Sequence, residues 1–297
     1  MCGIVGLFPK QLELEPRVGA LLADMLCQMT ERGPDSAGFA LYRDEVPEGQ
    51  VKLTLQSEND RADWTDFHRR LREWDGCATL VDHGSHSVVL TTVPPAEALV
   101  WLAANAAEYR VTSWGRSIEI YKQKGSPEHV IEQLHMRELG ATHALGHTRM
   151  ATESAVTTEH SHPFSTGGDL CLVHNGSLSN HNRLRQQLRE AGIHFQTDND
   201  SEVAAGYLTH RLGEGDSLEQ ALDHALRDLD GFYTFAIGTR DGFAVLRDPI
   251  ACKPAVLAET EEWVAMASEF RAIATLPGAD AARTWEPEPA RVYSWER

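Results

Sequence analysis

The second residue of the chain is a cysteine, and its position gives it a chemistry that the other cysteines lack. Cys2 follows Met1 directly, and it is small enough to allow removal of that methionine. The α-amino group freed in this way has a pKa of roughly 7.7–8.0 when unperturbed, which suits a general base at neutral pH. A thiol that carries its own base on the same residue is an amino-terminal nucleophile. Many chains begin with Met-Cys by chance, so this interpretation depends on further motifs.

The other potential metal ligands and thiols favour no second reactive centre. His160 and His162, with His174 nearby, invite a metal assignment, but no third or fourth ligand is spaced for one, and we expect no metal site. The five cysteines include no Cys-x-x-Cys pair, which argues against a disulfide framework and favours a reducing cytoplasm. Cys27, in a helical pattern, and Cys171, in a strand pattern, are expected to be buried apolar residues.

Composition indicates an ordinary soluble globular protein. Apolar residues make up 42% of the 297 residues, and the formal net charge is −17. This charge disfavours binding to nucleic acid or to an anionic membrane. No apolar run reaches the roughly 18 residues needed to span a bilayer, and the first eight residues lack the features of a signal peptide. We therefore expect a cytoplasmic protein.

The elements that must position Cys2 form two blocks. Apolar patterns predict strands at 2–8, 37–42 and 143–149, with a helix whose apolar stripe runs from Val18 to Met29. The second block has a strand at 170–173, helices at 179–191, 200–213 and 217–228, and strands at 232–238, 243–247, 255–257 and 263–268. Adjacent strands separated by turn residues indicate antiparallel hairpins. The pattern favours a layered sheet sandwich with outer helices over a parallel sheet.

Residues from about 60 to 120 are predicted to form an inserted small α/β unit. A helix at 61–74, strands at 78–81 and 87–93, a helix at 96–108 and a closing strand at 116–122 account for it. The stretch contains no cluster of reactive side chains. We expect a structural or partner-facing role for it.

Several motifs in order resemble the class II glutamine amidotransferases of the amino-terminal-nucleophile hydrolase superfamily. These are Cys-Gly-Ile-Val-Gly at 2–6, Arg-Gly-Pro-Asp-Ser-Ala-Gly at 32–38, Gly-His-Thr-Arg-Met-Ala-Thr at 146–152, His162-Pro163, His-Asn-Gly at 174–176 and Asp-Asn-Asp-Ser-Glu-Val at 198–203. The segments 230–233, 247–249 and 267–269 resemble the closing strands of the family. The resemblance implies an α+β fold, a four-layer αββα sandwich of two antiparallel sheets, in a single amidotransferase domain over residues 2–297.

The resemblance also implies a role for each matched residue. Cys2 would attack the side-chain amide of glutamine and form a glutamyl thioester. Arg149, supported by Thr152, would bind the substrate carboxylate, since a guanidinium group suits that anion. Asp200 would bind the ammonium group. Asn175 and the backbone N–H of Gly176 would form the oxyanion hole. His162 and Arg32 match positions near the substrate.

Simpler roles for these residues stay open at this stage. Asp200 could be the N-cap of the helix that follows it, and Asn175-Gly176 is also a common hairpin turn. Arg32 and Asp35 could brace the loop over the thiol without touching the ligand. The chain also departs from many relatives: Met150, Glu153 and Ser154 replace residues of an Arg-Trp-Ala-Thr-His-Gly segment, and Pro34 replaces a tyrosine.

The layout is most similar to the small amidotransferase-like subunit of glutamate-synthase-like complexes, particularly N-methylglutamate synthase. That resemblance implies partner subunits with an FMN- and iron–sulfur-containing barrel and a β-helix, and no cofactor in this chain. Because the amidotransferase pattern fills the chain, we expect ammonia to pass to a separate synthase subunit. Two alternatives are a non-catalytic glutamine- or glutamate-binding subunit and an amidase acting on acylated amines.

Overall fold

The larger sheet of the protein carries the amino-terminal strand at its centre. The computed structural model describes residues 2–59, 62–151 and 157–297. Within them the larger sheet has the order β14-β12-β13-β1-β8-β2-β7, with antiparallel pairing throughout. Its strands are β1 (Gly3–Pro9), β2 (Ser36–Tyr42), β7 (Ile118–Lys124), β8 (His143–Arg149), β12 (Val256–Glu259), β13 (Trp263–Ala267) and β14 (Arg283–Trp285). β1, β2 and β8 are buried along their whole length because both faces are covered.

A smaller antiparallel sheet packs against the larger one. Its order is β15-β11-β10-β9, and its strands are β9 (Cys171–Leu178), β10 (Gly231–Gly238), β11 (Gly242–Arg247) and β15 (Val292–Glu296). Fully buried side chains from both sheets form the core between them, among them Ile4, Leu145, Val173, Ala236 and Val245. This core fixes how the ends of β1, β8 and β9 lie relative to one another.

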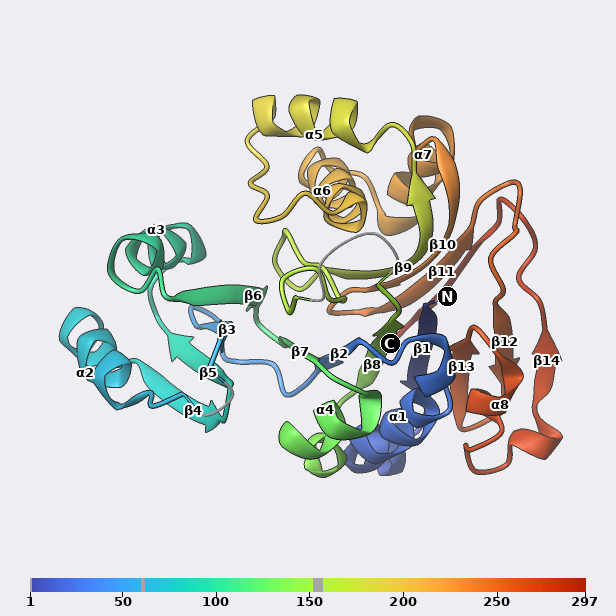
Figure 1. Cartoon of the computed structure of the whole chain (residues 1–297), viewed down its shortest axis with the longest axis horizontal. Coiled ribbons are helices and arrows are strands. Elements are labelled where there is room, and N and C mark those ends of the chain that lie inside the picture. Colours follow the sequence, from blue (N-terminus) through green and yellow to red (C-terminus); the bar gives the residue numbers. More distant parts are fainter. Residues whose placement is uncertain (1, 60–61, 152–156) are drawn as a thin grey trace.

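Helices cover the outer faces of both sheets (Figure 1). α1 (Val18–Cys27), α4 (Pro127–Gln133) and α8 (Phe270–Ile273) share a core with the larger sheet. α5 (His181–Glu190), α6 (Asp200–Gly213) and α7 (Leu218–Asp228) share a core with the smaller sheet. Short 3-10 helices lie at Leu12–Arg17, Thr30–Arg32, Met136–Glu138 and Ala279–Ala281. In the described residues the layers follow the order helix, sheet, sheet, helix, which confirms the predicted αββα sandwich.

A separate sheet with two helices projects from one side of the sandwich (Figure 1). It has the order β4-β5-β3-β6 and comprises β3 (Val51–Ser57), β4 (Thr79–His83), β5 (His86–Thr91) and β6 (Tyr109–Gly115), with α2 (Thr65–Trp74) and α3 (Pro95–Asn105). We call residues 51–115 the side lobe. The side lobe differs from the inserted unit that we expected at about 60–120. It begins earlier, with β3, and it includes β6, which was not predicted. The strand expected to close the unit is β7, which belongs to the larger sheet. Aromatic and aliphatic side chains such as Phe67 and Leu102 give the lobe its own core.

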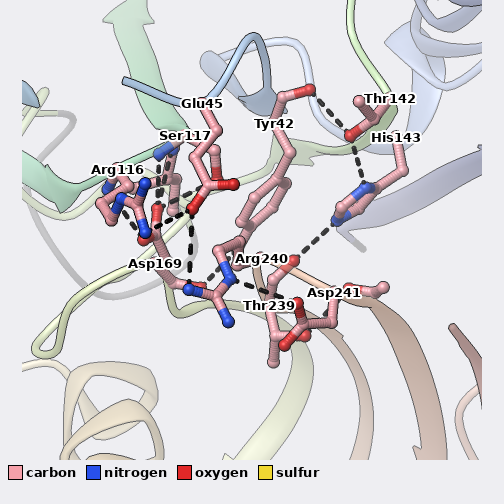
Figure 2. Close-up of polar contacts among 12 residues, drawn as sticks. Tyr42, Glu45, Arg116, Ser117, Thr142, His143, Asp169, Thr239, Arg240 and Asp241 are labelled. Atoms are coloured by element: carbon pink, nitrogen blue, oxygen red, sulfur yellow. Dashed lines mark hydrogen bonds and ion pairs between the residues drawn. The ribbon is translucent and has the colours of Figure 1, made fainter. Parts of the chain in front are cut away.

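Asp169 fastens the root of the side lobe to the sandwich. Its carboxylate accepts hydrogen bonds from the backbone N–H groups of Arg116 (2.7 Å), Ser117 (2.8 Å) and Ile118 (3.0 Å), in the turn between β6 and β7. Figure 2 shows this clamp beside Tyr42, whose hydroxyl donates to the main-chain oxygen of Asp169. Ser36 and Tyr42 are the first and last residues of β2, and Ser36 pairs with Arg149 of β8. At 3.3 Å per residue, the clamp beside Tyr42 is therefore about 20 Å from the end of β2 that lies next to Arg149.

Two further expectations concern the cysteines and membranes. Cys171 is fully buried in β9, as expected. Cys27, the last residue of α1, meets the expectation only in part: it packs against the core of the larger sheet but is partly exposed. Among the described residues, no helix has the length and apolar character needed to cross a bilayer.

Candidate active site

A cavity of about 290 Å³ opens where the ends of the two sheets meet the start of α6. The predicted site residues Cys2, Arg149, His162, Asn175, Gly176 and Asp200 all line it, together with Met150, His174, Asn199, Ser201 and Lys253. These residues come from segments that are up to about 250 positions apart, so only the folded sandwich brings them together. Arg32 is not among the described residues that line the cavity, and Thr152 lies outside the described residues.

Cys2 is held at the start of β1 by two hydrogen bonds to its main-chain oxygen. The Nε of Arg32 donates one at 3.0 Å, and the side-chain Nδ2 of Asn175 donates the other at 3.3 Å. The next residue, Gly3, lies opposite Thr148 of β8, and a Cβ on Gly3 would come within 2.8 Å of both Met29 and Thr148 side-chain atoms. The tight packing fixes the backbone, while Cys2 itself stays partly exposed at the cavity.

The loop at 32–36 braces both Cys2 and the end of β8. Arg32 also donates to Glu269 through Nη1 at 2.7 Å, and the residue is 8% exposed. The backbone N–H of Asp35 donates to the main-chain oxygen of Arg149 (3.1 Å), and the carboxylate of Asp35 accepts from the N–H of Ala151 (2.8 Å). The observed contacts of Arg32 and Asp35 are therefore bracing contacts.

Asn175 and Gly176 lie inside a strand. The alternative that they form a hairpin turn is wrong, because β9 continues to Leu178 and pairs Asn175 with Thr234 and Gly176 with Tyr233. Gly176 has a φ of +151°, and a Cβ there would lie 2.0 Å from the main-chain oxygen of Phe232. Only glycine allows this backbone path. Within this strand the Asn175 side chain is buried and reaches the main-chain oxygen of Cys2.

Asp200 is the first residue of α6 and not its N-cap. Asn199 is the N-cap, since its side chain accepts from the N–H of Ser201 at 2.8 Å, so the alternative capping role for Asp200 is wrong. The Asp200 carboxylate accepts from the N–H of Leu178 at 2.9 Å and from the hydroxyl of Ser201 at 3.3 Å. These bonds orient a carboxylate on the cavity wall that also carries Arg149, so the cavity presents a cation and an anion.

Three neighbouring histidines form an uncharged part of the cavity wall and its backing. The rings of His147 and His162 stack at 4.0 Å, and the ring of His174 lies 6.4 Å from that of His162. Burial lowers the pKa of His147 to about 3 and that of His162 well below its ordinary value. Burial also lowers the pKa of His174, against the opposing charge of Asp200. These rings are uncharged at neutral pH.

His162 is positioned by contacts on both sides. Its Nδ1 accepts from the backbone N–H of His174 at 3.1 Å, which ties it to β9. On the other side, Lys122 of β7 donates to the main-chain oxygen of Ser161 at 2.9 Å, and burial lowers the pKa of Lys122 to about 8. With Nδ1 already occupied by the backbone, His162 shapes the cavity wall.

Sequence reasoning assigned no role to Lys253, which the structure places on the cavity wall. Lys253 follows the 247–249 segment that carried part of the family resemblance, and this proximity is the sequence signal that could have found it. Among the described residues, no group of three or more His, Cys, Asp or Glu side chains is arranged to hold a metal ion. His160 instead contacts Asp198 at 2.8 Å.

Comparisons with known proteins agree on one family. A model of the "Glutamine amidotransferase domain" matches residues 147–275. The "Glutamine amidotransferase-like protein GlxB" of Rhizobium meliloti (strain 1021) is 54% identical over 100% of this chain and 98% of its own length. A "Putative glutamine amidotransferase" of Methanothermobacter thermautotrophicus is 31% identical over 99% of both chains. The solved "allosteric regulatory enzyme of purine biosynthesis" shares the fold at a TM-score of 0.65 and 20% identity, over 99% of this chain and 47% of that chain.

Proposed function

This chain belongs to the class II glutamine amidotransferase family, and from that premise we propose that it hydrolyses glutamine at Cys2. Arg149 binds the substrate carboxylate and Asp200 binds its ammonium group, which places the side-chain amide beside Cys2. The single observation that carries the proposal is the cavity that unites a cation, an anion, the Cys2 thiol and the Asn175 amide. A zwitterionic amino acid with a side-chain carbonyl fits that set of groups.

The proposed reaction has two steps. The Cys2 thiol loses its proton to the α-amino group, and the sulfur attacks the amide carbon. Asn175 and the backbone N–H of Gly176 stabilise the negative charge that forms on the amide oxygen. The carbon–nitrogen bond then breaks, the leaving nitrogen takes up the proton and ammonia departs. Water hydrolyses the remaining glutamyl thioester and releases glutamate.

The test of this activity is release of both ammonia and glutamate from glutamine by the purified chain. The proposal predicts equal amounts of the two products and no turnover by the Cys2→Ala variant. Turnover that survives in Cys2→Ala would contradict the assigned nucleophile. Loss of Thr152, the predicted support for Arg149, should raise the KM for glutamine.

We further propose that the ammonia passes to a separate synthase subunit, in a glutamate-synthase-like or N-methylglutamate synthase complex. The support for this is the layout of the sequence motifs, which resembles the small amidotransferase-like subunit of such complexes. The FMN and iron–sulfur cluster would then belong to the partner barrel subunit, beside a β-helical subunit. Glutaminase activity should rise when the partners are added. Equal activity of the isolated chain at every glutamine concentration would contradict this coupling.

A further inference from the structure

The cavity carries one more positive charge than glutamine requires. Among the described residues that line it, the charged side chains are Arg149, Lys253 and Asp200. Glutamine has one carboxylate and one ammonium group, and its side chain is neutral. Pairing those two groups with Arg149 and Asp200 leaves the ammonium group of Lys253 without a counterpart on the substrate.

The backbone of Lys253 is fixed on the side of the cavity that holds Asn175. Its main-chain oxygen accepts hydrogen bonds from Arg247 (Nη2, 2.9 Å) and from the hydroxyl of Thr234 (3.4 Å). Thr234 of β10 lies directly opposite Asn175 of β9. The segment that carries Lys253 is therefore held against the strand pair that contains the proposed oxyanion hole.

The side chain of Lys253 lies on the same side. Its Nζ is 5.1 Å from the ring centroid of Phe232, and the main-chain oxygen of Phe232 closely approaches Gly176. The charge of Lys253 also contributes to the lowered pKa of His174, which precedes Asn175 in β9. These contacts locate a cation near the point where the side-chain end of the substrate would sit.

Lys253 has no anionic partner within the described part of the chain. No carboxylate lies within 4.0 Å of its Nζ there, whereas the Nζ of Lys10 contacts Glu259 at 2.6 Å. Lys253 is partly buried, and its Nζ lies over the ring of Phe232. A carboxylate that binds next to this ammonium group forms a charge pair that stabilises the bound state.

We infer that Lys253 makes the cavity selective for glutamate, the product of the proposed hydrolysis, over glutamine. Glutamate has two carboxylates and one ammonium group, which match Arg149, Lys253 and Asp200 in number and sign. Hydrolysis converts the neutral side-chain amide into a carboxylate, and Lys253 pairs with that new charge. The inference rests on the proposed function, because it uses the same orientation of the amino acid. Its consequence is that glutamate is retained and competes with glutamine.

Binding measurements on chains that cannot turn over test the inference. The Cys2→Ala chain would be titrated calorimetrically with L-glutamate and with L-glutamine, alone and combined with Lys253→Met or Lys253→Arg. We expect Lys253→Met to weaken glutamate binding about 10-fold, the effect of about 1.4 kcal/mol, and glutamine binding less than threefold. Lys253→Arg should restore most of the preference. Lys10→Met, which removes the same charge far from the cavity, should change neither affinity.

Each other outcome overturns the inference in a recognisable way. An equal loss of both affinities in Lys253→Met means that Lys253 only shapes the cavity. No change in either affinity means that its charge does not reach the ligand. In both cases the proposed glutaminase function stands. If the Cys2→Ala chain binds neither amino acid, the proposed function falls together with the inference.

Discussion

The side-chain amide of Asn175 donates a hydrogen bond to the main-chain oxygen of Cys2, with an Nδ2–O distance of 3.3 Å. Cys2 precedes β1 of the larger sheet, and Asn175 lies in β9 of the smaller sheet. The proposed nucleophile and the proposed oxyanion donor therefore meet only because the two sheets pack face to face. The buried side chains between the sheets, such as Ile4 and Val173, set that distance.

Asn175→Ala should reduce kcat for glutamine hydrolysis by about 10²–10³-fold, the usual effect of removing one oxyanion-hole donor. The affinity for glutamine, measured in a Cys2→Ala background, should change much less, because the oxyanion forms only during reaction. Asn182→Ala, at an exposed position of α5, is the matched control and should keep full activity. An equal loss of kcat in both variants would contradict the role of Asn175.

Asp200→Asn should raise the KM for glutamine by about 10- to 100-fold, since a hydrogen bond to a charged group contributes about 1.5–3 kcal/mol. The new amide oxygen can still accept from the N–H of Leu178, so the fold should persist. Asn199→Ala separates binding from helix capping. It should lower the free energy of unfolding by about 1 kcal/mol without a comparable rise in KM. Similar KM values for the two variants would argue that Asp200 acts only through the start of α6.

Arg32→Met should lower kcat at least 10-fold while leaving the KM for glutamine within about threefold. Arg32 holds the main-chain oxygen of Cys2 and is not among the described residues lining the cavity. Its partner Glu269 would keep an ion pair with Arg271 at 2.8 Å, so the variant leaves no isolated carboxylate. Steady-state kinetics distinguish a residue that braces Cys2 from one that contacts the substrate, because a large rise in KM would indicate direct contact with the substrate.

The elements of the sandwich were predictable from local patterns, and the side lobe was less so. The apolar run of β1 and the apolar stripe of α1 predicted their elements within a few residues. β6 was missed because Tyr109–Gly115 mixes polar and apolar residues without a clear alternation. Asn175-Gly176 illustrates the same limit, since a dipeptide typical of turns is held in a strand by its pairing with β10.

The cavity residues that belong to a sequence motif were predictable, whereas an isolated charged residue of the cavity wall was not. Cys2, Arg149 and Asp200 lie in segments that resemble a known family as whole motifs. Lys253 is one lysine in a loop, and its place beside the oxyanion side depends on how β10 and β11 hold the main chain. Long-range packing of this kind leaves no periodic signal in the sequence.

Acidification should destabilise the protein partly through His143, whose ring stacks on Tyr42 at 4.2 Å (Figure 2). Burial lowers the pKa of His143 to about 4, against about 6.5 in the unfolded chain. Between these values the unfolded state binds the proton and the folded state does not, so stability falls as the pH drops from about 6.5 towards 4. The free energy of unfolding, measured in urea, should fall between pH 7 and pH 5 by about 2 kcal/mol less in His143→Gln than in wild type. Identical losses would contradict this.

The assignment of Cys2 is tested by the intact mass of the chain after treatment with a glutamine-analogue diazo-ketone, compared between wild type and Cys2→Ala. We expect the wild-type chain to lack Met1 and to gain a single adduct, and Cys2→Ala to gain none. Retention of Met1, or no Cys2-dependent adduct even with candidate partner subunits present, would contradict an amino-terminal cysteine nucleophile in a glutamine cavity.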